Sequence, residues 1–262
     1  MHKLIDQPLL ARILQHESDY WSTIAQVEQH NGWKSYTNPA FAPRIDPNHA
    51  GDFRTAAGEA PRIVAEISAT FRSRNLTPAA YVDLLAPDDL VPALLQAGFQ
   101  EWSGATNNLL LYDATDQRSA TPVSAAAVSV TVVESEEDRQ AWAGIMEETT
   151  GTDERPLLQQ LYYTEICDPR ITAYLVRVDG EPACRAELFS ADGLGRVEAV
   201  RTAERFRSCG LASAAIRTAI RDSQRQGNQL TYIYCEPDSA AQRLYQKLGF
   251  VLAAELVTRS FC

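Results

Sequence analysis

Two stretches of this chain run through the same succession of features, and this repeat restricts the fold more than any other property of the sequence. They are "AAYVDLLAPDDLVPALLQAGF" at 79–99 and "QLTYIYCEPDSAAQRLYQKLGF" at 229–250. Each is typical of a strand, a proline with acidic neighbours, a helix and a closing Gly-Phe pair, with spacing that differs by about one residue. Two copies of one strand-helix unit predict two related domains that mix helices and strands.

The segment "ATDQRSATPVSAAA" at 114–127 separates the two copies. Its residues are small or polar, it contains a proline, and its apolar residues have no helical or strand period. We therefore expect a linker here, with a domain boundary near residue 120. This divides the chain into an N-terminal domain over 1–120 and a C-terminal domain over 121–262.

The first half alternates expected helices and strands. Apolar residues at helical spacing over 8–30 predict one or two helices, and Asn31-Gly32 is interpreted as their stop. The turn-rich segment 36–53 follows, and a turn is the preferred interpretation around His49. We then expect, in order, a helix at 61–74, a strand at 79–85, a helix at 87–99 and a strand at 105–113.

The second half has clearer signals. Ser135 is a predicted helix N-cap, and Asp179-Gly180 is a strong hairpin signal between two strands. The alternation over 195–202 predicts a strand with Glu198 and Val200 on the same face. The remaining expected elements are a strand at 128–133, helices at 155–166, 211–226 and 237–249, and strands at 230–236 and 250–261.

The segment "RFRSCGLASAAIR" at 205–217 places small residues and a glycine between arginines and an apolar helical run. A helix start offers unpaired N–H groups and the positive end of the helix dipole. A glycine there lets the backbone approach a ligand closely. These features indicate a bound anion at the start of this helix.

The residues at 200–213, "VRTAERFRSCGLAS", resemble the acetyl-coenzyme A motif of the GNAT superfamily of N-acetyltransferases. In that motif a strand ending V-x-T leads into R-x-x-G-x-G/A and a helix. The second family block, an acid or Asn followed by A-x-x-L-Y-x-K-x-G-F, is similar to 238–250. The resemblance covers about 128–262 and implies two tandem GNAT-like domains of the α/β (α+β) class, each a mixed, mostly antiparallel twisted sheet flanked by helices. The N-terminal domain lacks the first block, so we expect a degenerate domain without cofactor.

The resemblance also implies acetyl-coenzyme A as cosubstrate, with its pyrophosphate on the loop and its pantetheine arm along the strand. Ser208 and Cys209 stand where the family often has glycine and a basic residue, and Asp238 replaces the commoner Asn. No residues have the spacing of metal ligands, so we expect no metal. The implied cofactor-binding residues are Val200, Thr202, Arg207, Ser208, Cys209, Gly210, Leu211, Ala212, Ser213, Asp238 and Ala241.

Direct attack of an amine on a thioester needs a base for the ammonium and an acid for the departing thiolate. By resemblance Tyr245 occupies the position of the acid, with a core tyrosine as the alternative. Glu198 is the candidate base and Glu187, on the preceding strand, is the reserve. A solvated glutamate on a strand face is the alternative interpretation for either.

The chain has 34 acidic and 24 basic residues and a formal charge of −10, which argues against general affinity for nucleic acid or an anionic membrane. The odd number of cysteines, five, suggests reduced thiols in the cytoplasm. We expect an N-acetyltransferase for a small primary amine, such as an amino acid, an antibiotic or a related metabolite. A protein or aminoacyl-tRNA acceptor and a non-catalytic acyl-coenzyme A scaffold stay as alternatives, and a homodimer stays open.

Overall fold

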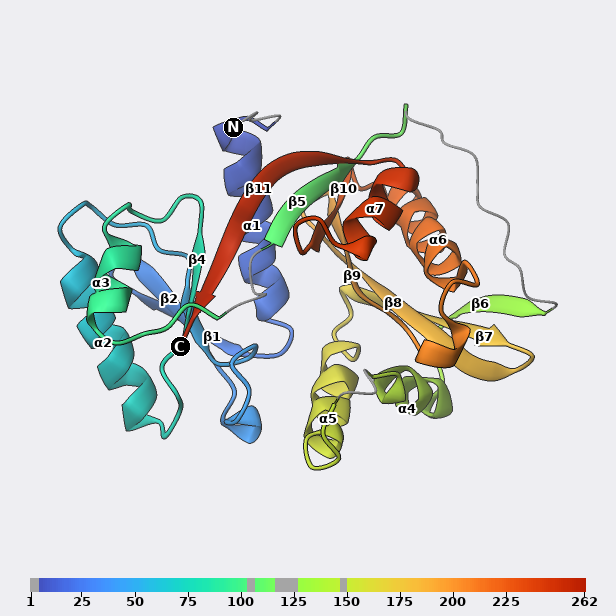
Figure 1. The fold of residues 1–262 in the computed structure, drawn as a ribbon, viewed down its shortest axis with the longest axis horizontal. Coiled ribbons are helices and arrows are strands. Elements are labelled where there is room, and N and C mark those ends of the chain that lie inside the picture. Colours follow the sequence, from blue (N-terminus) through green and yellow to red (C-terminus); the bar gives the residue numbers. More distant parts are fainter. Residues whose placement is uncertain (1–4, 103–106, 116–126, 147–149) are drawn as a thin grey trace. The chain divides into compact units, whose positions relative to one another are not determined.

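The computed structural model describes residues 5–102, 107–115, 127–146 and 150–262 (Figure 1). The chain forms two compact units. The first consists of Met1–Leu109, Cys235–Ser239 and Ala253–Cys262, and the second of Leu110–Tyr234 and Ala240–Leu252. Most of the expected linker at 114–127 lies outside the described residues, so the boundary near residue 120 stays a prediction.

In the first unit, helices cover both faces of a small sheet. Its strand order is β1-β2-β3-β4-β11, with β3 and β4 parallel and the other pairs antiparallel. Trp33 reaches Glu66 of α2 on one face, and Tyr36 reaches Ser18 of α1 on the other. The elements are α1 (Gln7–Trp21), β1 (Gln26–His30), β2 (Trp33–Thr37), η1 (Pro39–Phe41), β3 (His49–Gly51), α2 (Ala60–Ser73), β4 (Ala80–Asp83), α3 (Leu90–Gln96) and the last part of β11 (Phe250–Phe261).

The expectation of helix up to residue 30 was wrong. Helix α1 ends at Trp21, and β1 and β2 pair as a hairpin in which His30 faces Trp33. Asn31-Gly32 is the turn of this hairpin, and Gly32 has φ +88°. The helical spacing of apolar residues gave a wrong prediction here because β1 is an almost fully exposed edge strand. Val27 is exposed, so it does not mark a face that packs on the core.

His49 lies in β3 and not in a turn, because the segment around it pairs with β2. It is 1 % exposed and its ring stacks on Tyr36 and Tyr81, at centroid distances of 4.6 and 4.1 Å. Burial lowers the pKa of His49 to about 4, against the hydrogen bond between Nδ1 and the Asp46 carbonyl, which raises it. The ring is therefore neutral and structural.

We expect acid to destabilise the protein through His49. Its folded pKa lies below its unfolded pKa, so its contribution is present above about pH 6.5 and is lost as the pH falls towards 4. Linkage gives a loss of about 2 kcal/mol in the free energy of unfolding between about pH 7 and pH 5. Urea denaturation at several pH values should show this loss, and His49→Phe should flatten it. An equally steep profile in His49→Phe would contradict the assignment.

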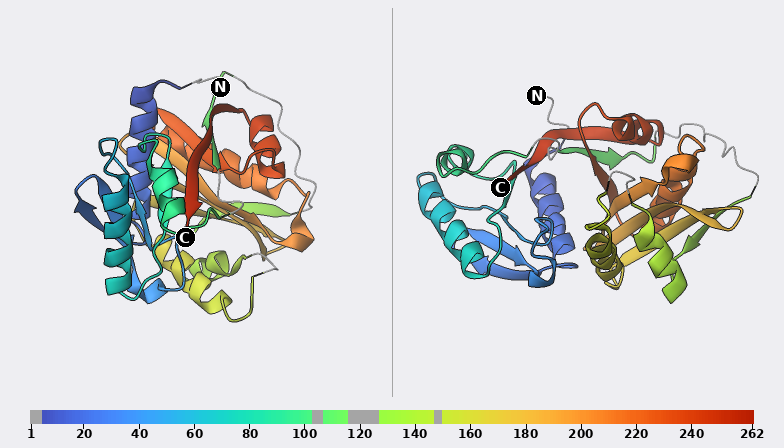
Figure 2. Two further views of the ribbon diagram at one scale, coloured as in Figure 1. Left: turned by 60° about the vertical axis from the view of Figure 1, so that its left-hand side comes forward. Right: turned by 60° about the horizontal axis from the view of Figure 1, so that its bottom comes forward.

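In the second unit, one part of the sheet lies between α6 on one face and α4 with α5 on the other (Figures 1 and 2). Its order is β10-β9-β8-β7-β6, antiparallel except for the parallel pair of β9 and β10. The elements are β6 (Val128–Val132), α4 (Glu136–Gly144), α5 (Arg155–Glu165), β7 (Ile171–Val178), β8 (Glu181–Ala191), β9 (Leu194–Thr202), η2 (Glu204–Phe206), α6 (Leu211–Arg225), β10 (Leu230–Cys235) and α7 (Ala240–Lys247). Strands β5 (Asn107–Tyr112) and β11 contribute residues to both units.

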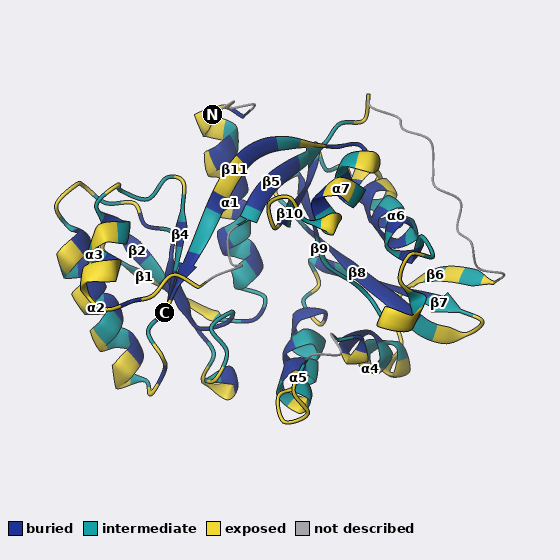
Figure 3. Cartoon of the chain, in the orientation of Figure 1, coloured by how far each residue is buried: buried dark blue, intermediate teal, exposed yellow. Residues whose placement is uncertain are grey.

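Several local signals in this unit agree with the structure. Ser135 caps α4 by accepting a hydrogen bond from the Asp138 N–H at 3.0 Å. Asp179 and Gly180, both at positive φ, join β7 and β8. Figure 3 shows a buried β8 and a largely exposed β6 at the sheet edge. The core side of α6 is the expected one, with Leu211, Ala215, Ile216, Ala219 and Ile220 buried.

The two copies of the repeat share their ending. Helix α3 stops at Gly98, φ +92°, before Phe99, and α7 stops at Gly249, φ +96°, before Phe250. Both phenylalanines are buried, at 8 and 2 % exposure. In each copy a glycine with positive φ follows the helix and lets the chain turn back towards the sheet, where the buried phenylalanine packs in the core.

Candidate functional site

The loop between β9 and α6 has two residues with left-handed backbone. After η2, Ser208 and Gly210 both take positive φ values, +63° and +81°. Gly210 is the N-cap residue of α6 and supplies no side-chain cap. The side chain of the N-cap residue therefore accepts no hydrogen bond from the first N–H groups of this 15-residue helix. Alternation of ordinary and left-handed residues is how backbone N–H groups form a concave anion site.

The charge at the start of α6 differs from that of the other helices with a described N-cap. Most of those begin at an acidic residue, and α4 begins at Ser135 followed by three acidic residues. Negative charge there neutralises the positive helix end and repels a phosphate. The other N-caps are Asp6, Glu59, Asp89 and Glu154.

The arginines of the loop are exposed and weakly held. Arg207 lies 3.5 Å from Glu204, and both side chains are about half exposed. Arg205 pairs with Glu181, also at the surface. Exposed pairs of this kind contribute little to stability, so either guanidinium can exchange its partner for a phosphate oxygen. The other side chains of the loop range from exposed Ser208 to buried Leu211 and Ser213, with Cys209 and Ala212 between them.

A bulge in β9 sets the direction of the residues before the loop. Ala199 has φ +53°, and the pairing of β8 with β9 shifts between Arg185 and Glu187. Val200 consequently packs against the cluster that includes Leu211 of α6. Glu198 pairs with Glu187 of β8. Both glutamates lie on the face of the sheet opposite to Val200. The expectation that Glu198 and Val200 share a face was wrong, because the bulge adds one residue to the alternation.

Thr202 lies on the α6 face. Its hydroxyl donates to the Cys184 sulfur at 3.2 Å, and burial raises the pKa of the Cys184 thiol to about 11. The thiol is therefore a neutral part of the core.

The parallel ladder between β9 and β10 is short. It runs from Leu194 and Leu230 to Val197 and Ile233, although β9 continues to Thr202 and β10 to Cys235. In the described residues the pairing of β9 with β10 does not extend beyond Val197. Peptide groups at a strand edge beyond such pairing can bond an extended ligand that carries amides, as a further strand would.

Glu198 is held by one well-formed ion pair. Its Oε2 accepts from Arg196 Nη2 at 2.6 Å and from Nε at 3.1 Å, and its side chain is 32 % exposed. Arg196 is buried and also lies over the Tyr234 ring. Glu187, the reserve candidate, is fully buried opposite Glu198. Both candidate bases therefore lie side by side on the face that α4 and α5 cover.

The residues of the second block lie on α7 and in the segment that precedes it. Tyr245 is a buried residue of α7, 7 % exposed, with its ring 6.2 Å from that of Phe250. Ala241 is on the same helix, and Asp238 is exposed at φ +54° in a segment that groups with the first unit. Roles for Tyr245, Ala241 and Asp238 stay predictions.

Sequence reasoning missed Arg185 on β8, which shares a face with Glu187. It is 4 % exposed, and its guanidinium carbon lies 4.5 Å from the Trp142 ring centroid and 4.0 Å from that of Tyr162. A charged residue two positions from Glu187, inside an otherwise small and apolar strand, was the available signal.

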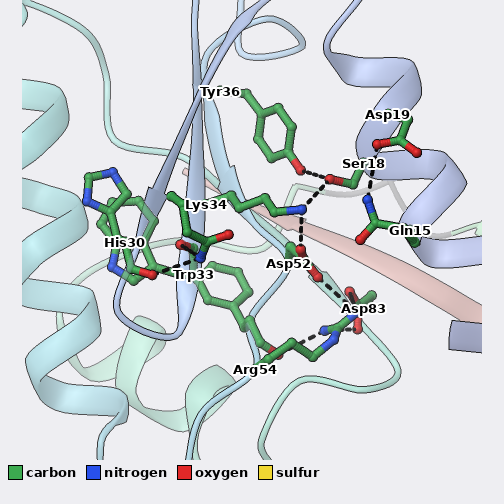
Figure 4. A network of polar contacts seen from close by, with 12 residues as sticks. Gln15, Ser18, Asp19, His30, Trp33, Lys34, Tyr36, Asp52, Arg54 and Asp83 are labelled. Atoms are coloured by element: carbon green, nitrogen blue, oxygen red, sulfur yellow. Dashed lines mark hydrogen bonds and ion pairs between the residues drawn. The ribbon is translucent and has the colours of Figure 1, made fainter.

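The first unit contains a network of polar contacts between α1, β2 and the segments around Asp52 and Asp83 (Figure 4). Lys34 lies 2.7 Å from Asp52 and donates to Ser18 at 2.9 Å. Arg54 makes two bonds to Asp83, at 3.0 and 2.9 Å. Each of these charges has a partner of opposite sign within the network, so the cluster is explained by structure alone.

No cluster of three or more His, Cys, Asp or Glu side chains among the described residues could hold a metal ion. None of the described helices has the length and apolar character needed to span a membrane.

Comparisons with known proteins agree with this geometry. The family described as "Acetyltransferase (GNAT) family" matches residues 139–250, which include β9, the loop and α6. No curated protein matches the sequence.

Solved structures share the fold over nearly all of the chain. A GCN5-related N-acetyltransferase from Kribbella flavida aligns with a TM-score of 0.70 at 22 % identity, covering 96 % of this chain and 94 % of its own. A GNAT-family acetyltransferase, described as putative, from Novosphingobium aromaticivorans DSM 12444 gives 0.60 at 20 % identity, covering 98 and 97 %.

A tandem GNAT protein from the clavulanic acid biosynthesis pathway gives a TM-score of 0.54 at 12 % identity and covers 81 % of this chain and 74 % of its own. The fold of the chain is thus that of GNAT proteins, including a tandem one. Residues 139–250 match the acetyltransferase (GNAT) family, and the chain as a whole has the fold of GNAT proteins.

Proposed function

We propose that this protein transfers an acetyl group from acetyl-coenzyme A to the primary amine of a small molecule in a ternary complex. The start of α6 carries the proposal. Left-handed Gly210 opens the helix without a side-chain cap and without the acidic residue found at other helix starts, inside the segment that matches the family. A pyrophosphate fits this backbone.

The proposed binding roles use three features: the loop after β9, one edge of β9 and the face of β9 that carries Glu198. The N–H groups of the loop from Arg207 to Ala212 bind the pyrophosphate, assisted by Arg207. The free edge of β9 near Val200 bonds the amides of the pantetheine arm. When bound, acetyl-coenzyme A supplies an activated acetyl thioester. The amine enters from the face that carries Glu198.

Two residues move protons in the proposed reaction. Glu198 accepts a proton from the acceptor ammonium, directly or through water, so that the nitrogen forms a bond to the acetyl carbon. As the carbon–sulfur bond breaks, Tyr245 gives its hydroxyl proton to the departing sulfur, and the second proton that the nitrogen loses restores the Tyr245 hydroxyl. Glu198 releases its proton to solvent. Arg196 holds the Glu198 carboxylate in position through its two hydrogen bonds.

Removing the Tyr245 hydroxyl should slow the reaction moderately. A thiolate leaves readily because its parent thiol has a pKa near 8.5, so we expect kcat of Tyr245→Phe to fall by about tenfold with KM little changed. Steady-state kcat and KM of the variant and the wild type provide the measurement. A kcat equal to that of the wild type would mean that Tyr245 only packs in the core.

The function is tested by measuring thiol release from acetyl-coenzyme A with three acceptor classes, namely small amines, lysine-containing peptides and aminoacyl-tRNA. Turnover with small amines supports the proposal. Turnover restricted to peptides or to tRNA would replace the acceptor, and salt-sensitive RNA binding would accompany the latter. Binding of acetyl-coenzyme A without turnover would favour a scaffold.

The cytoplasm is the proposed location. All five cysteines are free, and two of them, Cys184 and Cys235, are buried. Free thiols suit a reducing compartment.

A further inference from the structure

We propose that Arg185 binds the carboxylate of the acceptor, which makes the acceptor an amino acid or a close derivative with a free carboxylate. This inference rests on the proposed function, because it names the substrate class of the same site. It begins from an unusual side chain. Arg185 is 4 % exposed, and its Nε and Nη1 are buried without a hydrogen-bond partner among the described residues.

The surroundings of Arg185 compensate its charge only in part. Its guanidinium lies over the rings of Trp142 and Tyr162. Cation–π contacts of this kind offset part of the cost of burying a charge, but they leave the unpaired N–H donors without acceptors. A bound anion would supply the missing acceptors. Tyr162 is the more exposed of the two rings and covers the guanidinium from the outside.

Two other arginines on this side of the sheet have a carboxylate partner. Arg170 also lies over an aromatic ring, that of Phe189, but two atoms of Asp168 neutralise it at 2.7 and 2.8 Å. Arg196 has Glu198. Among the described residues, Arg185 has no ion pair of this kind.

The position of Arg185 suits an acceptor that carries both charges. Arg185 and Glu187 alternate on β8 so that they share a face, about 7 Å apart along the strand, and Glu198 pairs across from Glu187. The guanidinium can hold a carboxylate while the glutamates attract the ammonium that Glu198 deprotonates. A dianionic phosphate suits this face less well, because both glutamates would repel it.

The test compares acids with their amides. We would measure kcat/KM for common L-α-amino acids and for the corresponding carboxamides, in wild type, Arg185→Met and Arg170→Met. A charged hydrogen bond of this kind corresponds to a preference of about 30-fold for the acid. We expect this ratio in wild type and in Arg170→Met, and a ratio near one in Arg185→Met. Equal use of acids and amides by wild type, or a preference that persists in Arg185→Met, would overturn the inference.

A second measurement separates this inference from the proposed function. Unchanged binding of acetyl-coenzyme A establishes that Arg185→Met is folded. If no amine is acetylated, the proposed function fails, and thermal stabilisation of the same variants by amino acids then decides the role of Arg185. Stabilisation of wild type that amides do not reproduce and that Arg185→Met loses would sustain carboxylate binding. No stabilisation, or the same stabilisation in both proteins, would refute it.

Discussion

Replacing Gly210 with glutamate should raise the Kd for acetyl-coenzyme A by more than about 100-fold. The new carboxylate would lie where the first N–H groups of α6 meet the pyrophosphate, and repulsion between such charges near a surface amounts to several kcal/mol. The side chain would also oppose the φ of +81°, which costs about 1–2 kcal/mol in any residue with a Cβ. Isothermal calorimetry measures the affinity directly.

The chain offers a matched control at the other end of the same helix. Gly227 has the same φ of +81°, and a Cβ added there would meet nothing within 4 Å. Gly227→Glu therefore carries the same backbone strain without the proposed ligand. We expect similar thermal destabilisation in the two variants but normal acetyl-coenzyme A affinity in Gly227→Glu. Equal losses of affinity would mean that strain, and not the anion site, explains the effect.

Changing Glu198 to glutamine should lower kcat by about 100-fold while leaving the acetyl-coenzyme A affinity little changed, as expected when a general base is lost. The amide keeps an oxygen that can accept from Arg196, so the fold of this part of β9 should survive. Rates should be measured with a saturating amine, beside calorimetric titration with acetyl-coenzyme A. A fall in kcat without a loss of acetyl-coenzyme A affinity would identify Glu198 as the base.

Glu187→Gln is the comparison variant for this experiment. Glu187 pairs across from Glu198 and is fully buried, so the two changes are alike in chemistry and place. We expect the larger loss in Glu198→Gln because its side chain is partly exposed, so the carboxylate can meet the acceptor and pass its proton to solvent. A larger loss of kcat in Glu187→Gln would assign the role of base to Glu187. Unchanged rates in both variants would mean that neither glutamate is the base.

The fold of the second half could be predicted because its local signals agree with its tertiary structure. Ser135 at a helix start, Asp179-Gly180 between strands and the apolar face of α6 each depend on residues close in sequence. In the first half, Asn31-Gly32 follows a strand with almost no buried residue, so the hairpin lacked the alternating pattern that normally reveals it.

The details of the site were harder to obtain from the sequence. The bulge at Ala199 reverses the faces of β9, and an alanine at φ +53° has no sequence signature. Arg185 depends on rings from α4 and α5, which are distant in sequence. The backbone at Gly210 could be predicted because a residue with positive φ directly before a helix is most often glycine.

The most direct test of the account is a calorimetric titration of the wild-type protein with acetyl-coenzyme A. One molecule should bind per chain, since the second unit begins α6 at uncapped Gly210 while the described helices of the first unit begin at acidic residues. Binding of two molecules per chain would contradict the assignment of a single site to the second unit. No binding would contradict the assignment of the α6 loop as a pyrophosphate site.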